Sequence, residues 1–336
     1  MSIMLEEILS QKKCLKNTFS SNVKEIEKLK KIIKKKNLKH FEIIARGSSR
    51  NATEIFKYEL ESKSDFRVSY VYPSTVTKYK GKLNPSSIYL AVSQGGKGED
   101  LKLVLEAAKK SGAYTVAITN EENSPLSKIA DFNLYLKVGK ENSMAATKTF
   151  TSEMLVLEML ALALSNEDYS SLEKITELFL PIKNKEILSF VDALKKPKNL
   201  FVLTRGKLLG VGKEVCCKLQ ETCFKNANCF ASSDFMHGPF ALVDKTFIGL
   251  FLVPNDDTKD DVLNLIKKVN ENNGKTLVIS SEKVQCFKQL KIKNTDNILY
   301  PFLMTFIIQL LSANLSKCLK IDADKSRNLN KYTKTI

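Results

Sequence analysis

The segments FEIIARG at residues 41–47 and LFVLTRG at residues 200–206 share one pattern, an apolar run closed by Arg-Gly. Each apolar run is typical of a buried strand, and each glycine opens a stretch with helical character. Arg46 and Arg205 stand 159 residues apart in the 336-residue chain. Two later pairs of strand ends repeat this offset at 161 residues, namely Val92 with Val253 and Asn120 with Ser281. The nearly constant spacing predicts that the two halves are copies of one fold.

Strand-like runs alternate with helical patterns in both halves. In the first half the predicted strands are Phe41–Ala45, Arg67–Val71, Ser86–Val92, Tyr114–Thr119 and Phe132–Leu136, with helices at about 49–61, 98–111 and 124–130. In the second half the predicted strands are Leu200–Thr204, Phe247–Val253 and Thr276–Ser280. Because parallel strands need long crossovers, this alternation predicts the α/β class, with two doubly wound, flavodoxin-like parallel sheets flanked by helices.

Helical sequence surrounds and separates the two copies. From Phe150 to Leu164 the only charges are Glu153 and Glu158, which predicts a buried helix. Helical patterns at 170–180 and 182–195 end at Lys196-Pro197, and an apolar helix runs from Pro301 to about Lys320. We therefore expect N-terminal helices over 1–40, a first domain over 41–165, a helical linker over 166–197, a second domain over 198–320 and a polar tail over 321–336.

The charge balance is basic, with 53 Lys and Arg against 37 Asp and Glu and a net charge of +16. The densest basic stretch, Lys24 to His40, alternates lysines with Ile26, Leu29 and Ile33 and has no aromatic residue before Phe41. This pattern predicts an amphipathic helix with a solvated face, which attracts anions in general. We expect no nucleic-acid partner.

Cysteine, histidine and hydropathy patterns exclude other classes. The seven cysteines form no CxxC pair and there are two histidines, so we expect no zinc site, no other metal and no disulfide framework. Glu6 and Glu7 stand where a signal peptide would be basic and then apolar, and the longest apolar run, Phe302 to Leu311, is too short for a bilayer. We expect a cytoplasmic protein without a membrane partner.

Three small, hydroxyl-rich or glycine-rich turns follow predicted strands of the first copy. They are Gly47-Ser48-Ser49, then Ser93-Gln94-Gly95-Gly96-Lys97-Gly98, and Ala145-Ala146-Thr147-Lys148-Thr149. Each alone is more typical of a capped turn than of a ligand site. Three at the carboxyl edge of one parallel sheet favour a ligand site, because backbone amides and hydroxyls at helix starts bind phosphate.

The second copy carries a set of acid–base residues. Glu214, Lys218 and Glu221 occupy positions i, i+4 and i+7 of a predicted helix from about Lys207 to Thr222, so they share one stripe. If that stripe faces a cleft, the central cation holds both acids ionised as bases; otherwise the three form exposed ion pairs. His237, in a turn ending His237-Gly238-Pro239, is a candidate acid–base group or a hydrogen-bonded surface residue.

In this combination and order, the motifs resemble the isomerase half of glucosamine-6-phosphate synthase, which consists of two tandem sugar isomerase (SIS) domains. The resemblance runs from about residue 25 to the C-terminus and includes the tail Arg327-Asn328-Leu329-Asn330-Lys331. It implies two tandem SIS domains in this chain. It also implies a homodimer that acts on a small sugar phosphate.

The resemblance implies a role for each matching residue. Phosphate would be bound by Ser49, Ser93, Gln94 and Thr147, with the neighbouring positions Gly47, Ser48, Gly95, Lys97, Gly98, Ala146 and Asn330. Glu221 would move a proton between sugar C1 and C2, supported by Lys218 and Glu214. His237 would open the sugar ring from the other subunit, and Lys331 would lie over the open-chain sugar. Such enolisation needs a positioned base and cations near the oxygens, without a metal or organic cofactor.

The sequence departs from the family at three places. Gly95-Gly96-Lys97-Gly98 replaces Ser-Gly-Glu-Thr, which removes two hydroxyls and exchanges an acid for a cation, and Ala146 replaces a serine. The first α/β copy begins by residue 41, which leaves no room for the synthase's glutaminase domain. We therefore expect that this chain does not by itself take ammonia from glutamine.

Stand-alone double-SIS proteins resemble amino-sugar-phosphate deaminases or fructosamine-6-phosphate deglycases. The predicted function is a phosphosugar isomerase/deaminase that converts glucosamine 6-phosphate and water to fructose 6-phosphate and ammonia. The alternatives are a deglycase, a synthase isomerase unit that uses free ammonia or a separate glutaminase, and a non-catalytic sugar-phosphate sensor. Against the sensor stand the intact Glu221, Lys218 and His237, and a first forty residues that predict two amphipathic helices without a helix-turn-helix.

Overall fold

The computed structural model describes residues 2–179 and 184–329. The chain forms two compact units, each built around one parallel sheet. The first-sheet unit comprises residues 10–141 and 146–176, with 328 and 329 of the tail. The second-sheet unit comprises residues 2–9, 142–145, 177–179 and 184–327.

The two sheets have the same topology. The first runs in the order β2-β1-β3-β4-β5 and the second, read from its β7 edge, in the order β7-β6-β8-β9-β10. Every strand pair is parallel. Both sheets therefore have the flavodoxin-like 2-1-3-4-5 order, which confirms the predicted fold class and the internal repeat.

The strand bounds follow the apolar runs closely. In the first sheet they are β1 His40–Ala45, β2 Arg67–Tyr70, β3 Ile88–Val92, β4 Tyr114–Thr119 and β5 Phe132–Tyr135. In the second they are β6 Asn199–Thr204, β7 Asn226–Ala231, β8 Ile248–Leu252, β9 Lys275–Ser280 and β10 Lys288–Lys291. The central β3 is buried at all five residues, because helices cover both faces of a parallel sheet.

Two strands, β7 and β10, were not predicted from the sequence. Both are edge strands of the second sheet, and polar residues interrupt their apolar ones, as the sequences NANCFA and KQLK show. Edge strands are half solvated and commonly carry polar or charged residues that discourage pairing with other chains. Their apolar signal is therefore too weak to separate them from loops.

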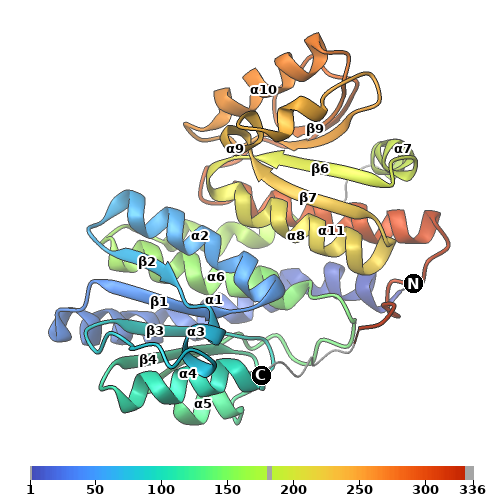
Figure 1. Ribbon diagram of the computed structural model, residues 1–336. Helices are drawn as coiled ribbons and strands as arrows, with labels where there is room; N and C mark the ends of the chain where they lie inside the picture. The colour runs from blue at the N-terminus through green and yellow to red at the C-terminus, as the bar shows by residue number, and fades with distance from the viewer. Residues whose placement is uncertain (1, 180–183, 330–336) are drawn as a thin grey trace. The chain divides into compact units, whose positions relative to one another are not determined.

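Helices cover both faces of the first sheet. Figure 1 shows α2 and α6 on one face and α4 and α5 on the other. The bounds are α2 Gly47–Lys63, α3 Pro73–Thr77, α4 Glu99–Lys110, α5 Pro125–Ile129 and α6 Lys148–Leu164. All seventeen residues of α6 are buried, as predicted, and this helix packs closely along α2.

The second sheet is covered in the same way, with α9 and α10 on one face and α8 and α11 on the other (Figure 1). The bounds are α7 Asn184–Lys195, α8 Leu209–Cys223, α9 Ser232–Met236, α10 Lys259–Glu271 and α11 Tyr300–Cys318, with short 3₁₀ helices η2 Gly206–Leu208 and η3 Pro239–Leu242. The core on the α9 side combines Leu203, Phe235 and Phe251 with residues of α10.

The Arg-Gly pairs that revealed the repeat have one physical role. Gly47 and Gly206 both adopt a positive φ, +51° and +62°, at the step from strand to helix. A left-handed residue at this step turns the chain sharply, and glycine adopts that conformation without steric cost.

The first forty residues contain one long helix, α1 Ile3–Lys36, so the prediction of two helices is wrong. The segment has no glycine or proline to break it. Ile26, Leu29 and Ile33 are buried as predicted, while most of the lysines between them face solvent. Within the first-sheet unit, Asn22 donates a hydrogen bond to the Tyr135 carbonyl at 2.8 Å and so anchors α1 beside β5.

The segments flanking the second sheet also differ in detail from the prediction. The pattern at 170–180 forms a 3₁₀ helix, η1 Ser170–Leu178, and not an α-helix. In the tail, the Asp324 carboxylate accepts hydrogen bonds from the backbone N–H of Ile3 and Met4 at 2.7 and 2.9 Å. This carboxylate caps the start of α1, where backbone N–H groups otherwise lack partners.

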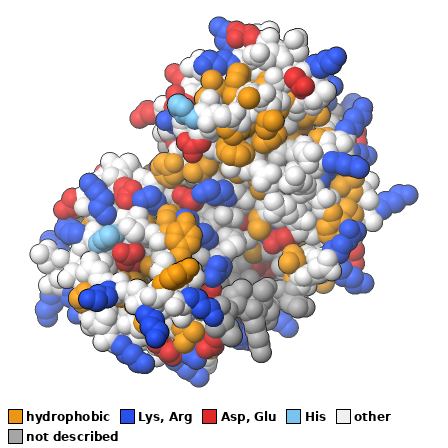
Figure 2. All heavy atoms as spheres, in the orientation of Figure 1, with side chains coloured by type: hydrophobic (Ala, Val, Ile, Leu, Met, Phe, Trp, Pro, Cys, Tyr) orange, Lys and Arg blue, Asp and Glu red, His pale blue; other side chains and the backbone are white. Residues whose placement is uncertain are grey.

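Positive charge is spread over the surface. Figure 2 shows Lys and Arg side chains interspersed with Asp and Glu on the visible face. Among the described residues, no helix has the length and apolar character required to cross a membrane.

Candidate active site

An ion pair joins the first two predicted phosphate turns. Arg46, which precedes Gly47, donates from Nε and Nη2 to Asp100 Oδ2 at 2.8 and 2.5 Å. Asp100 lies in the first turn of α4, two residues after Gly98, and is buried. The structure therefore brings Gly47-Ser48-Ser49 and the Ser93–Gly98 turn to the same edge of the first sheet. The positive charge of Arg46 compensates the negative charge of Asp100 beside these turns.

The first turn also contacts the buried helix α6. Ser49 Oγ donates a hydrogen bond to Glu153 Oε1 at 2.8 Å. Glu153 is 1% exposed, so its carboxylate needs such donors to offset the loss of hydration. To donate to a phosphate, the Ser49 hydroxyl must rotate away from this carboxylate.

The third turn is organised by Glu141, a residue that the sequence analysis did not single out. Its buried carboxylate accepts from the N–H and the hydroxyl of Thr147, at 2.8 and 3.0 Å, and from the Thr149 hydroxyl. The carboxylate thus caps the start of α6, the position where the family resemblance places phosphate binding. Ala146 follows Ala145 in this turn and provides no hydroxyl.

The second turn is the most altered of the three. Ser93 and Gln94 are half-buried, Gly95 is buried and Lys97 is exposed. A Cβ added at Gly98 would meet the nearest Leu101 carbon at 3.4 Å, an ordinary van der Waals contact. Packing therefore does not explain why this chain has Gly98 where the family has a threonine with its hydroxyl.

The charged stripe on α8 is a buried cluster. Lys218 Nζ lies 3.3 Å from Glu214 Oε1 and 2.7 Å from Glu221 Oε2. The side chains of Lys218 and Glu214 are fully buried, whereas 23% of the Glu221 side chain is exposed. The predicted ion pairs exist, but they are not solvated surface pairs. Glu221 is the member of the cluster that is accessible to solvent.

The charge states in this cluster follow from burial and proximity. Burial by itself lowers the pKa of Lys218, but the carboxylates of Glu214 and Glu221 outweigh it and raise the pKa above its ordinary value. Lys218 therefore stays an ammonium ion and compensates the carboxylates beside it.

Two contacts of Glu221 escaped the sequence analysis. Cys217 Sγ lies 3.5 Å from Glu221 Oε1 and donates to it, and Ser326 Oγ donates to the Glu221 carbonyl at 3.2 Å. The i, i+4 spacing of Cys217 and Glu221 is compatible with the first contact, but cysteine on a helix is usually a packing residue. Ser326 comes from the tail, and no local pattern links it to α8.

The remaining predicted site residues are distributed as follows. His237 ends α9 and its side chain is exposed. It belongs to the second-sheet unit with the Glu221 cluster, whereas the three turns belong largely to the first-sheet unit. Asn330 and Lys331 lie outside the described residues. Within residues 2–179 and 184–329, no group of three or more His, Cys, Asp or Glu side chains is arranged to hold a metal ion.

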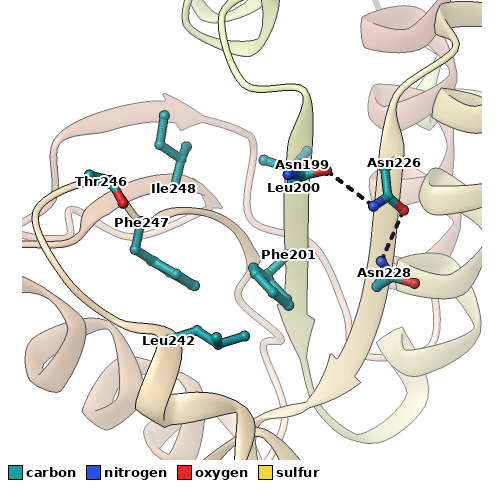
Figure 3. Close-up of a pocket in the computed structure, with 9 residues that line it drawn as sticks. All are labelled: Asn199, Leu200, Phe201, Asn226, Asn228, Leu242, Thr246, Phe247 and Ile248. Atoms are coloured by element: carbon teal, nitrogen blue, oxygen red, sulfur yellow. Dashed lines mark hydrogen bonds between the residues drawn. The ribbon is translucent and has the colours of Figure 1, made fainter.

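A cavity of 430 Å³ lies elsewhere, at the amino-terminal ends of β6, β7 and β8. Figure 3 shows Phe201, Phe247 and Leu242 facing it, with Asn199, Asn226 and Asn228 linked by hydrogen bonds at its rim. None of the predicted site residues lines it.

Because α8 carries buried thiols, we expect the protein to lose stability at alkaline pH. Burial raises the pKa of Cys217 to about 12 and that of Cys223 to about 11, from an ordinary value of 9.0. Above pH 9 the unfolded chain loses these protons while the folded chain keeps them, so the free energy of unfolding should fall by about 1.4 kcal/mol per pH unit for each thiol. Urea unfolding between about pH 9 and 11 measures this slope.

The matched variant for this measurement is Cys223→Ala. It should show a shallower alkaline slope than the unmodified protein, with no change of slope below pH 8. Equal slopes for the two proteins would show that the Cys223 thiol is not the titrating group.

The comparison with known families rests on both halves of the chain. Residues 32–163 and 193–316 match the model of the SIS domain family. The chain belongs to the SIS family. The two matched segments contain the two sheets, so the recognition of tandem SIS domains from the sequence is confirmed.

Curated relatives cover 98% of this SIS protein. It is 27% identical over 338 residues to glutamine–fructose-6-phosphate aminotransferase (isomerizing) of Aquifex aeolicus, with 98% of this chain and 57% of that protein covered. The same-named protein of Bacteroides thetaiotaomicron is 29% identical over 358 residues, with 98% and 58% covered. The chain therefore spans less than two thirds of the length of these relatives.

Solved structures show the same SIS architecture. The C-terminal domain of glucosamine-fructose-6-phosphate aminotransferase from Francisella tularensis superposes with a TM-score of 0.85, at 25% identity, covering 97% of this chain and 98% of that one. Glucosamine-6-phosphate deaminase from Thermotoga maritima gives 0.80 at 22% identity, covering 99% and 100%. The second likeness is one of fold alone.

Proposed function

We propose that this SIS protein is a phosphosugar isomerase/deaminase that converts glucosamine 6-phosphate and water to fructose 6-phosphate and ammonia. The observation that carries the proposal is the α8 cluster, in which a buried ammonium ion holds the half-buried carboxylate of Glu221. A carboxylate that is paired with a buried cation and lies at a partly exposed position is suited to act as a general base.

The chemistry requires one proton to move between neighbouring carbons. In the open-chain sugar, Glu221 removes the proton from C2, beside the C1 aldehyde, and the same acid returns a proton to C1, while the C1 oxygen gains a proton and the C2 nitrogen loses one. The product is the 2-imine of fructose 6-phosphate, to which water adds and from which ammonia leaves. The Lys218 ammonium ion pairs with the Glu221 carboxylate, and Glu214 balances the Lys218 charge.

In this proposal the turns of the first-sheet unit bind the phosphate. Ser49, Ser93, Gln94 and Thr147 supply donors, and Lys97 supplies a cation in place of the two hydroxyls that Gly95 and Gly98 lack. The protein acts as a homodimer without a cofactor, and the exposed His237 opens the sugar ring in the partner's site.

A second candidate is the reverse direction, in which fructose 6-phosphate and free ammonia form glucosamine 6-phosphate. It is favoured by the match of 98% of this chain to proteins named as isomerizing aminotransferases. Both directions pass through the same imine and use the same base.

The decisive experiment incubates the purified protein separately with glucosamine 6-phosphate, unphosphorylated glucosamine, fructosamine 6-phosphates of amino acids, and fructose 6-phosphate with ammonium. We expect ammonia release from the first and at most a trace from the second, because the phosphate supplies binding energy to the reacting end. Amino-acid release from the third, without ammonia from the first, identifies a deglycase. Turnover of none, with sugar phosphate bound, identifies a sensor.

A further inference from the structure

The Glu221 carboxylate is held at both oxygens. Lys218 Nζ lies 2.7 Å from Oε2, and Cys217 Sγ donates to Oε1 at 3.5 Å. Cys217 and Glu221 are four residues apart on α8, so the two side chains lie on adjacent turns of one face. We propose that Cys217 is a positioning residue for the reaction, whose S–H bond sets the orientation of the Glu221 carboxylate. This inference rests on the proposed role of Glu221 as the base.

A single bond to Lys218 does not fix a carboxylate. With one oxygen held, the group still rotates about the bond to its side chain, and the 23% exposure of Glu221 leaves room for this motion. A second donor on the other oxygen defines the plane of the group. Orientation matters for a base that must reach two neighbouring carbons in turn, because proton transfer depends on the alignment of the reacting atoms.

The thiol suits this position because it remains protonated. Burial, followed by the Glu214 carboxylate, raises the pKa of Cys217 to about 12, although the Lys218 ammonium acts in the opposite direction. At neutral pH the group is therefore a neutral, weak donor and neither a thiolate nor a nucleophile. A second cation would hold Oε1 more strongly and make it less basic, whereas a thiol orients the oxygen and adds no charge.

Two substitutions at Cys217 separate a donor from a packing residue, since they have opposite expected effects. Cys217→Ser keeps a hydrogen-bond donor, and Cys217→Val keeps the volume and removes the donor. With glucosamine 6-phosphate as substrate, we expect the valine variant to lose roughly tenfold in kcat with KM within about twofold, because orientation acts on the chemical step. The serine variant should recover most of this loss.

The matched control is Cys223→Val on the same helix. Cys223 is buried and its thiol donates to the Ser312 carbonyl at 3.5 Å, away from Glu221. This variant should keep the unmodified kcat per folded molecule. The proposal is overturned if the valine variant at 217 is as active as the unmodified protein, if serine is worse than valine, or if both lose activity equally.

A spectroscopic readout separates this inference from the proposed function. The S–H stretching band of Cys217, obtained as the infrared difference between the unmodified protein and Cys217→Val, should shift in Glu221→Gln and stay in place in Glu282→Gln. Glu282 is an exposed residue paired with Lys259, so it serves as a matched control. If the protein turns over no sugar phosphate but the band shifts, the contact is real and the assigned reaction is wrong. If the S–H band has the same frequency in Glu221→Gln as in the unmodified protein, the contact itself is contradicted.

Discussion

Glu221→Gln is expected to lower kcat for glucosamine 6-phosphate by about 10²- to 10⁴-fold, the range that a positioned general base contributes. Glutamine has the shape of glutamate but does not accept a proton from carbon. KM should change little, because in our proposal the phosphate is bound by the strand-end turns and not by Glu221. Steady-state ammonia release measures both constants.

The control for this substitution is Glu282→Gln, the same change at an exposed ion pair of the same unit. It should leave kcat unaltered, because Glu282 lies outside the α8 cluster. It should also leave the protein folded, because exposed ion pairs contribute little to stability. Full activity in Glu221→Gln would show that Glu221 is not the base and would overturn the proposed mechanism.

Lys218→Met is expected to destabilise the second-sheet unit by about 3–5 kcal/mol, because it leaves a buried carboxylate without its cation. Methionine matches the length of the lysine stem, so lost packing is a minor part of this effect. The Glu214 side chain has no exposed surface and would have to take up a proton or force open the core. Urea unfolding of both proteins at neutral pH gives the difference.

The double variant Glu214→Gln/Lys218→Met tests the origin of this loss. If the uncompensated charge is responsible, removing the carboxylate should restore more than half of the lost free energy of unfolding. A double variant as unstable as Lys218→Met would point to packing, and a single variant within about 1 kcal/mol of the unmodified protein would show that the cluster is more solvated than its geometry indicates.

Much of the fold follows from local patterns. The inner strands β3, β4 and β9 each contain an uninterrupted apolar run, and α6 is rich in apolar residues and has few charges, so their type and burial are visible without tertiary information. The edge strands β7 and β10 could not be recognised from the sequence, because most of their residues are at least partly exposed to solvent and form no continuous apolar run. The single helix α1 replaced the two predicted helices because its polar middle contains nothing that breaks a helix.

The candidate site divides in the same way. The spacing of Glu214, Lys218 and Glu221 predicted that they share one stripe of the helix, but it did not predict how deeply each side chain is buried. Spacing is a property of the helix alone, whereas the burial of Lys218 depends on what packs against α8, namely its own sheet and α11. The same residues on an uncovered helix would be solvated ion pairs of little consequence.

By itself, the sequence determined two copies of a parallel α/β sheet, the turns that follow their strands, and the stripe of candidate acid–base residues. These are encoded in short-range periodicity and in a repeat offset, which require no knowledge of packing. Only the tertiary structure decided which carboxylate keeps access to solvent, that Glu141 caps the third turn, and that Cys217 and Ser326 contact Glu221. The physical reason is that desolvation and side-chain hydrogen bonding depend on neighbours that packing supplies, many of them far away in the chain.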